Sequence, residues 1–154
     1  MKTFRFLAAR LALLLLFLMI TVLQLFSFPG QFAHMRRVHG SALALEIVLT
    51  ILVGCLFLAA QFALFSLWKL VSHMELETFF SPDAAPWLDK LVAALKFACI
   101  FPVALIFIVA PQADDPGALV LLTAVTLFVV TVYLLGSLLH DQVLQVIYRE
   151  NHSK

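Results

Sequence analysis

Long uncharged apolar stretches alternate with short polar segments along the chain. Four stretches cover residues 11–33, 47–68, 97–113 and 117–139, and the third extends backward through residues 91–95 with only Lys96 in between. A helix needs about 20 apolar residues to cross the roughly 30 Å of hydrocarbon in a bilayer. None of the stretches alternates with the period of two that a barrel strand requires. The pattern therefore predicts four membrane-spanning helices, at about 8–28, 44–70, 91–110 and 117–139.

The composition supports a lipid environment for this fold. Of 154 residues, 64% are hydrophobic and 12% are charged, against about 45–50% and about 25% in ordinary soluble domains. This excess excludes a soluble globular domain, a disordered tail and a disulfide scaffold. Cys55 and Cys99 lie in apolar stretches without metal or redox spacing, and a net charge of +1 predicts no direct nucleic-acid binding. We predict one all-α domain over residues 1–154, an integral membrane four-helix bundle in contact with the lipid bilayer.

The first apolar stretch also has features of a signal peptide, because Lys2, Arg5 and Arg10 precede it. Signal-peptide apolar cores run about 7–15 residues and end at a small-x-small site. Here the apolar part extends from residue 11 to residue 28, and residues 31–33 (Gln-Phe-Ala) make a poor cleavage site. We therefore expect a retained first helix, and a cleaved signal peptide is the alternative.

The basic residues predict an orientation, because Lys and Arg are enriched in cytoplasmic loops. With the amino terminus inside, Arg36 and Arg37 are the only two bases outside. The other eight are Lys2, Arg5, Arg10, Lys69, Lys90, Lys96, Arg149 and Lys154. We expect both termini and the loop 71–90 to be cytoplasmic, and the loops 29–43 and 111–116 to lie outside.

The central loop has its own helix signals. Ser81, Pro82 and Asp83 are typical of a helix start, and Trp87, Leu88 and Leu91 follow at helical spacing. These residues predict a short cytoplasmic amphipathic helix before the third span, with Trp87 at headgroup depth. Candidates for binding a cytoplasmic partner lie in this loop; they are Glu75, Glu77, Phe79, Phe80 and Trp87.

Two further features concern helix shape and packing. Pro102 predicts a kink in the third span, and Val143, Leu144 and Ile147 predict that the fourth helix continues past the membrane. Small residues four apart predict close helix packing, and intramembrane Gln and Thr predict hydrogen bonds between helices. The small residues are Cys55, Ala59, Ala63, Ala94 and Ala98, and the polar ones are Gln24, Gln61, Thr123, Thr126 and Thr131.

Polar residues on the outer side form a further candidate cluster. It comprises His34, His39, Glu46, Asp114 and Asp115. One hypothesis is an outward-facing site that binds a metal or senses protons. The alternative is that Glu46 is solvated at the membrane interface and paired with an arginine. Spacing between separate loops does not define a ligand set, so we predict no metal ligands and no cofactor.

Catalytic chemistry has little support in the sequence. Ser137, His140 and Asp141 fall within four residues, but a hydrolase also needs an oxyanion hole and a pocket. No nucleotide-binding or zinc-protease motif occurs either. We therefore predict no catalytic residues and a protein that is not an enzyme.

Two segments carry a resemblance. The turn Ala-Asp-Asp-Pro-Gly at 113–117 and the loop Glu-Thr-Phe-Phe-Ser-Pro-Asp at 77–83 resemble those of an uncharacterised family of small bacterial four-span membrane proteins that includes the YoaS-like proteins. The resemblance covers roughly residues 45–150. It implies a bacterial cytoplasmic (inner) membrane protein, sometimes encoded beside a small helix-turn-helix regulator, and it supplies no catalytic residues.

Two functions follow as hypotheses. The first is a non-enzymatic regulatory or accessory protein that binds a cytoplasmic partner such as a helix-turn-helix regulator. The alternative is a small ion-coupled or solute transporter that uses the outer polar cluster around Glu46. Against the transporter, no inverted repeat is visible and no ionisable residue lies in mid-span. A homo-oligomer is compatible with either function.

Overall fold

Helices make up the regular structure of the chain in the computed structural model, which describes residues 2–27, 30–31, 34, 37, 43–112 and 116–152. The α-helices are α1 (Lys2–Val22), α3 (Leu43–Glu75), α4 (Ala85–Ala98), α5 (Ile100–Val109) and α6 (Pro116–His152). A π-helical turn, η1 (Leu23–Ser27), extends α1, and a 3-10 turn, η2 (Ala110–Gln112), follows α5. Over these ranges the chain contains no strand.

Within the described residues, four helices are long and apolar enough to cross a membrane, as the apolar stretches predict. They are Thr3–Ser27, Leu43–Glu75, Ala85–Val109 and Pro116–Arg149. The last helix, α6, has 37 residues and is therefore about 55 Å long, well beyond the thickness of the hydrocarbon. It is continuous through Ile147, as the apolar spacing of Val143, Leu144 and Ile147 predicts, while its protrusion from the membrane stays a prediction.

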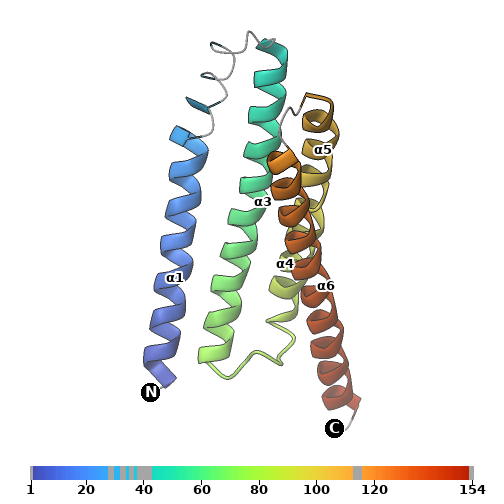
Figure 1. Cartoon of the computed structure of the whole chain (residues 1–154). Helices are drawn as coiled ribbons and strands as arrows, with labels where there is room; N and C mark the ends of the chain where they lie inside the picture. The colour runs from blue at the N-terminus through green and yellow to red at the C-terminus, as the bar shows by residue number, and fades with distance from the viewer. Residues whose placement is uncertain are drawn as a thin grey trace.

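The helices lie side by side with α3 at the centre (Figure 1). On one side α3 packs against α1, and on the other it packs against α4 and α5, which in turn contact α6. Both termini lie at the same end of the molecule (Figure 1). We call this end, which also holds the end of α3 and residues 76–84, the basal end.

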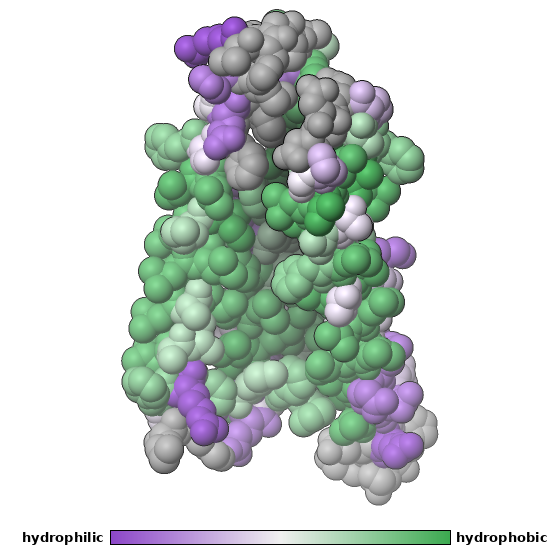
Figure 2. Space-filling model, viewed as in Figure 1, coloured by the Kyte–Doolittle hydropathy of each residue, from purple (hydrophilic) through white to green (hydrophobic). Residues whose placement is uncertain are grey.

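The largest buried cluster lies near the basal end. It joins α3, the loop, α4 and the last part of α6, and its buried members are Ala63, Leu70, Ala84, Leu88, Leu91, Ala94, Val143 and Ile147. A second cluster forms around Leu49, Val53 and Leu105. On the face shown in Figure 2, apolar side chains predominate in the middle and hydrophilic ones gather toward the two ends. An apolar middle of this kind is suited to contact with lipid.

The small residues pack as their spacing predicts. Ala59 and Ala63 of α3 and Ala94 and Ala98 of α4 are all buried, and α3 and α4 make the most extensive helix contact of the described residues. Small side chains allow the two backbones to approach closely, which compensates for the weak driving force for association in lipid.

Intramembrane polar residues divide into two groups. Gln61 Nε2 donates to Thr21 Oγ1 at 2.9 Å, and Gln24 Nε2 donates to the Gly54 carbonyl at 3.3 Å, so both glutamines tie α1 and η1 to α3 as predicted. The prediction was wrong for three threonines, whose hydroxyls donate to carbonyls four residues earlier in α6. These are Thr123, Thr126 and Thr131. A carbonyl of the same helix is always within reach, whereas a partner on another helix must be placed by packing.

The third span is interrupted where Pro102 requires it. Proline has no N–H to donate to the carbonyl four residues earlier, which is that of Ala98, and its ring clashes with that carbonyl. In the structure α4 ends at Ala98 and α5 begins at Ile100, with Cys99 as a turn between them. The Cys99 thiol donates a hydrogen bond to the Leu95 carbonyl, with its Sγ 3.3 Å from the oxygen.

The start of α4 differs from the prediction. The helix begins at Ala85 with Pro86 in its first turn, and no side chain caps it. Ser81 instead closes a turn, because its Oγ donates to the Thr78 carbonyl at 2.7 Å and its own carbonyl accepts the Ala84 N–H. The apolar face of α4 is buried against its neighbours, and α4 leads into α5 within one span. A separate amphipathic helix in the cytoplasm stays a prediction.

Candidate functional site at the basal end

Arg10 fixes the start of α1 to the end of α3. Its guanidinium forms an ion pair with Glu75 at 2.7 Å, donates to Ser72 Oγ at 3.2 Å and lies 5.9 Å from the centroid of the Trp68 ring. The side chains of Arg10 and Glu75 are 33% and 35% exposed. Glu75, a predicted partner-binding residue, is therefore already engaged within the chain.

Residues 76–84 form a structured turn after α3. Glu77 adopts a left-handed backbone conformation with φ 59°, which lets the Thr78 N–H reach back to the His73 carbonyl at 2.9 Å. The Thr78 hydroxyl and the His73 Nδ1 are also hydrogen-bonded, at 3.1 Å. A non-glycine residue in this conformation carries strain, which persists only where surrounding contacts maintain it.

Phe79 and Phe80 follow this turn with different surroundings. Phe79 packs against the basal buried cluster, and its ring meets that of Phe80 edge to face at 5.2 Å. Phe80 is 51% exposed, and Leu76, on the other side of the turn, is 70% exposed. The turn thus holds two large apolar side chains at the surface.

Trp87 lies between two lysines from different helices. Lys90 Nζ is 4.0 Å from the centroid of its ring, and Lys69 Nζ, on α3, is 5.5 Å from it. Phe65 meets the ring of Trp87 edge to face at 5.8 Å. Sequence spacing could have indicated the pairs Phe65–Lys69 and Trp87–Lys90, which are four and three residues apart on one helix. The approach of Lys69 to Trp87 depends on the packing of α3 on α4.

His140 joins α6 to α4 through Asp89. Its Nε2 lies 2.5 Å from Asp89 Oδ1, and its Nδ1 lies 3.1 Å from Asp141 Oδ1. Partial burial lowers the pKa of His140, but hydrogen bonds and charge from the two carboxylates outweigh it, so that the pKa is raised above 6.5. His140 lies just past the uncharged stretch 117–139.

Ser137, His140 and Asp141, which lie close together in sequence, do not form a catalytic group in the structure. The Ser137 hydroxyl donates to the Leu134 carbonyl of its own helix at 2.9 Å, while both ring nitrogens of His140 face carboxylates. A serine nucleophile would need the histidine as its base. The geometry of these three residues instead describes a polar contact between helices.

The outer polar cluster is only partly described. Glu46 is half-buried in the first turn of α3, and His34 is exposed. His39, Asp114 and Asp115 lie outside the described residues, so that their relation to Glu46 stays a prediction. Within the described ranges, no three His, Cys, Asp or Glu residues are placed to hold a metal ion.

Comparison with protein families places the chain. Residues 5–149 match a family described as "Protein of unknown function (DUF2975)". The chain belongs to this family. No curated protein and no solved structure matches the chain. Membership in DUF2975 agrees with the resemblance to an uncharacterised family, while the likeness to YoaS and a bacterial origin stay predictions.

Proposed function

We propose that this DUF2975 protein is a non-enzymatic regulatory or accessory protein of the bacterial inner membrane, with its basal end in the cytoplasm. At that end it binds a protein partner through the turn after α3. The observation that carries the proposal is the pair of exposed apolar side chains, Leu76 and Phe80, held on a structured turn.

The end of α3 is long enough to place the turn outside the hydrocarbon. The uncharged stretch of α3 ends at Trp68, and α3 continues to Glu75. Seven further residues correspond to about 10 Å of helix. Leu76 and Phe80 thus lie at or beyond the headgroups, where lipid tails do not cover them. Exposed apolar residues rimmed by polar ones favour a protein interface.

The charge of the turn favours a basic partner. Glu77 and Asp83 are exposed beside the two apolar residues, and residues 70–89 contain no Lys or Arg. A DNA-binding regulator has the complementary positive surface, and the resemblance leads us to expect a small helix-turn-helix protein encoded nearby. Binding to the turn would hold such a regulator at the membrane.

A binding experiment tests the proposal with that regulator as the probe. The full chain in lipid nanodiscs is immobilised, the purified regulator is titrated, and wild type is compared with Phe80→Ala. About half of the surface of Phe80 is exposed, roughly 100 Å². If the partner covers this area, removing the ring weakens binding at least tenfold.

The matched control is Phe107→Ala. Phe107 is 76% exposed on α5, inside the apolar part of the third span, so its removal leaves the affinity unchanged. Glu77→Lys also weakens binding, most strongly at low salt. Failure of the regulator to bind wild type, or equal affinity for wild type and Phe80→Ala, contradicts the proposal.

A further inference from the structure

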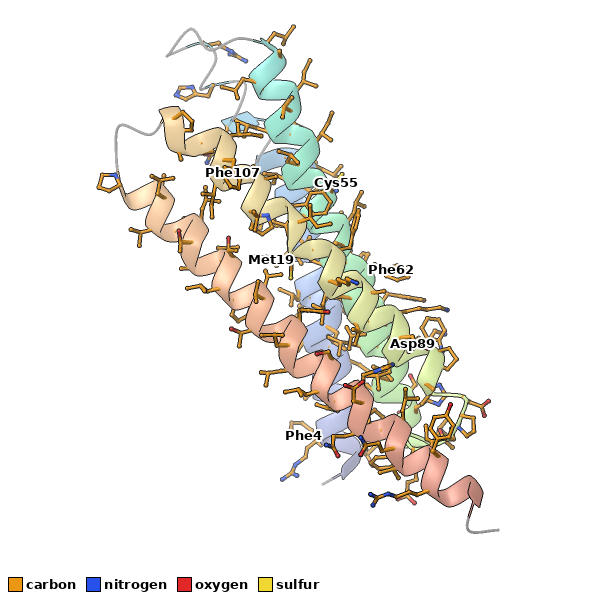
Figure 3. All side chains as sticks on the ribbon, turned by 90° about the vertical axis from the view of Figure 1, so that its right-hand side faces the viewer. Phe4, Met19, Cys55, Phe62, Asp89 and Phe107 are labelled. Carbon is orange, nitrogen blue, oxygen red and sulfur yellow. The ribbon has the colours of Figure 1, made fainter. Side chains whose placement is uncertain are left out.

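A groove between α3 and α4 opens toward the surrounding lipid. It encloses about 260 Å³ and is lined by Cys55, Leu58, Ala59, Phe62, Ala94 and Phe97. Ala59 and Ala94 are buried and give the groove its depth, whereas Phe62 and Phe97 are about half exposed and form its walls. Cys55 and Phe62 project from the same side of α3 (Figure 3). The lining is apolar, as an acyl chain requires.

Two lysines lie on the basal side of this groove. Lys69 follows Phe62 by seven residues on α3, and Lys90 precedes Ala94 by four residues on α4. Both ammonium groups lie near the ring of Trp87, which links the two helices at this level.

Neither lysine is neutralised by a carboxylate. Among the described residues, the ion pairs involve Arg10, His140 and their acidic partners, and neither Lys69 nor Lys90 takes part in one. Asp89, next to Lys90 in sequence, is engaged by His140. A cation–π contact uses one side of an ammonium group, so each lysine keeps N–H donors for another acceptor.

The lysines and the groove lie at the depths expected for the phosphate and the acyl chain of a phospholipid. Lys69 is the first charged residue after the uncharged stretch 47–68, which places it at the edge of the hydrocarbon. The groove residues Ala94 and Phe62 lie about 6 Å and about 10 Å farther along their helices, toward the bilayer centre. A phosphate at the lysines would therefore place its ester-linked chain at the groove.

We propose that this groove binds one anionic phospholipid, with the phosphate held between Lys69 and Lys90 and an acyl chain lying against Phe62 and Phe97. Basic pockets between membrane helices on the cytoplasmic side favour anionic headgroups. The occupant is a lipid and not a soluble phosphate, because the groove beyond the lysines is apolar and opens into the bilayer. This site is separate from the turn that we assign to a protein partner.

A second groove in the same molecule supplies an internal comparison. A cavity of about 240 Å³ between α1 and α3 is lined by Leu13, Phe17 and Trp68, among others, and is equally apolar. Arg10, whose guanidinium lies 5.9 Å from the centroid of the Trp68 ring, is paired with Glu75. Lys69 also approaches this groove, because its Nζ lies 5.7 Å from the centroid of the Phe65 ring in the lining. With one lysine in place of two, this groove should select an anionic lipid less strongly.

Fluorescence quenching by brominated lipids tests the proposal in reconstituted full-length protein. Trp68 and Trp87 are the only tryptophans, so Trp68→Phe makes Trp87 the single reporter. Brominated phosphatidylglycerol and brominated phosphatidylcholine with the same acyl chains are compared. Each lysine near a membrane surface contributes about a factor of five, so two predict an about 25-fold preference for phosphatidylglycerol at Trp87.

Three variants distinguish lipid selection at this site from a general attraction of anionic lipid to the positive charge of the protein surface. The double variant Lys69→Gln and Lys90→Gln removes the preference, whereas Lys96→Gln, which takes one positive charge from another position on α4, leaves the preference within about twofold. Trp87→Phe makes Trp68 the reporter, and the preference there is at most about fivefold, because only Lys69 approaches that groove unpaired. Equal quenching by the two lipids at Trp87, or an equal loss in Lys96→Gln, overturns the proposal.

Two additions test the apolar part and the source of the phosphate. Cys55→Phe fills the groove and lowers the phosphatidylglycerol preference about fivefold or more, with an unchanged melting temperature as the check on folding. Free glycerol 3-phosphate does not displace the brominated lipid. An unaltered preference in a folded Cys55→Phe variant, or displacement by glycerol 3-phosphate, rejects an acyl-chain groove.

Discussion

Leu88→Ala is the substitution that most directly tests the basal buried cluster. Leu88 is 3% exposed and packs among Leu70, Val143 and Ile147, which come from α3 and α6. The change removes three carbon atoms, worth about 0.8 kcal/mol each, and leaves a cavity that the helices fill only in part. We expect a loss of about 3 to 4 kcal/mol in the free energy of unfolding.

The matched control lies on the lipid-facing side of α6. Leu138 is 62% exposed, and in a bilayer it contacts lipid both when the helices are associated and when they have separated. Leu138→Ala therefore costs no more than about 0.5 kcal/mol, as surface substitutions usually do. The predicted difference between two Leu→Ala changes is thus about 3 kcal/mol.

Unfolding by titration with sodium dodecyl sulfate from mixed micelles measures this difference. Trp87 packs against the basal cluster, so its fluorescence reports on the region that Leu88→Ala perturbs. Equal midpoints for the two variants, or a loss below about 1 kcal/mol in Leu88→Ala, would refute the packing that we describe, since a buried Leu→Ala change typically costs 2–5 kcal/mol.

Two further predictions concern the polar contacts that join the helices. The raised pKa of His140 means that its stabilising contact with Asp89 is complete below 6.5 and is lost as the pH rises through the folded-state value. Stability should therefore fall as the pH rises above about 6.5, and Asp89→Asn should reduce this dependence; a pH profile of the unfolding midpoint checks both. For Arg10 and Glu75, a double-mutant cycle with Arg10→Gln and Glu75→Gln should give a coupling energy of about 1 kcal/mol, since the pair is only partly exposed. Independent effects of the two changes would show that the pair does not hold α1.

The number of spans could be predicted from the sequence because the interactions that form a span lie within one continuous stretch of residues. A run of about 20 apolar residues both prefers lipid and must satisfy its backbone as a helix. The break before Pro102 is local in the same way, since the missing donor affects only the carbonyl four residues earlier. The end of α3 was harder to predict, because a helix continues into water as long as its backbone hydrogen bonds form.

The particular partners of the polar and charged residues near the basal end could not be predicted from spacing. His140 and Asp89 are 51 residues apart, so no local pattern indicates their contact. Asp141, the next residue in the sequence, also contacts His140, whereas Ser137 donates to the Leu134 carbonyl instead. Lys69 meets Trp87 only because small residues bring α3 and α4 together. The start of α4 was predicted three residues too early, because Ser81 and Pro82 suit a helix start. In the structure the Ser81 hydroxyl instead donates to the Thr78 carbonyl and closes a turn.

Labelling of single cysteines in cells tests the central claim, that the basal end faces the cytoplasm. Cys55 and Cys99 are first replaced by Ala, and then Gln31→Cys or Phe80→Cys is introduced. Both residues are exposed, and they lie on opposite sides of the predicted membrane. A maleimide that cannot cross the membrane should label Gln31→Cys in intact cells and Phe80→Cys only after the cells are opened. Labelling of Phe80→Cys in intact cells would contradict the orientation and, with it, the proposed cytoplasmic partner.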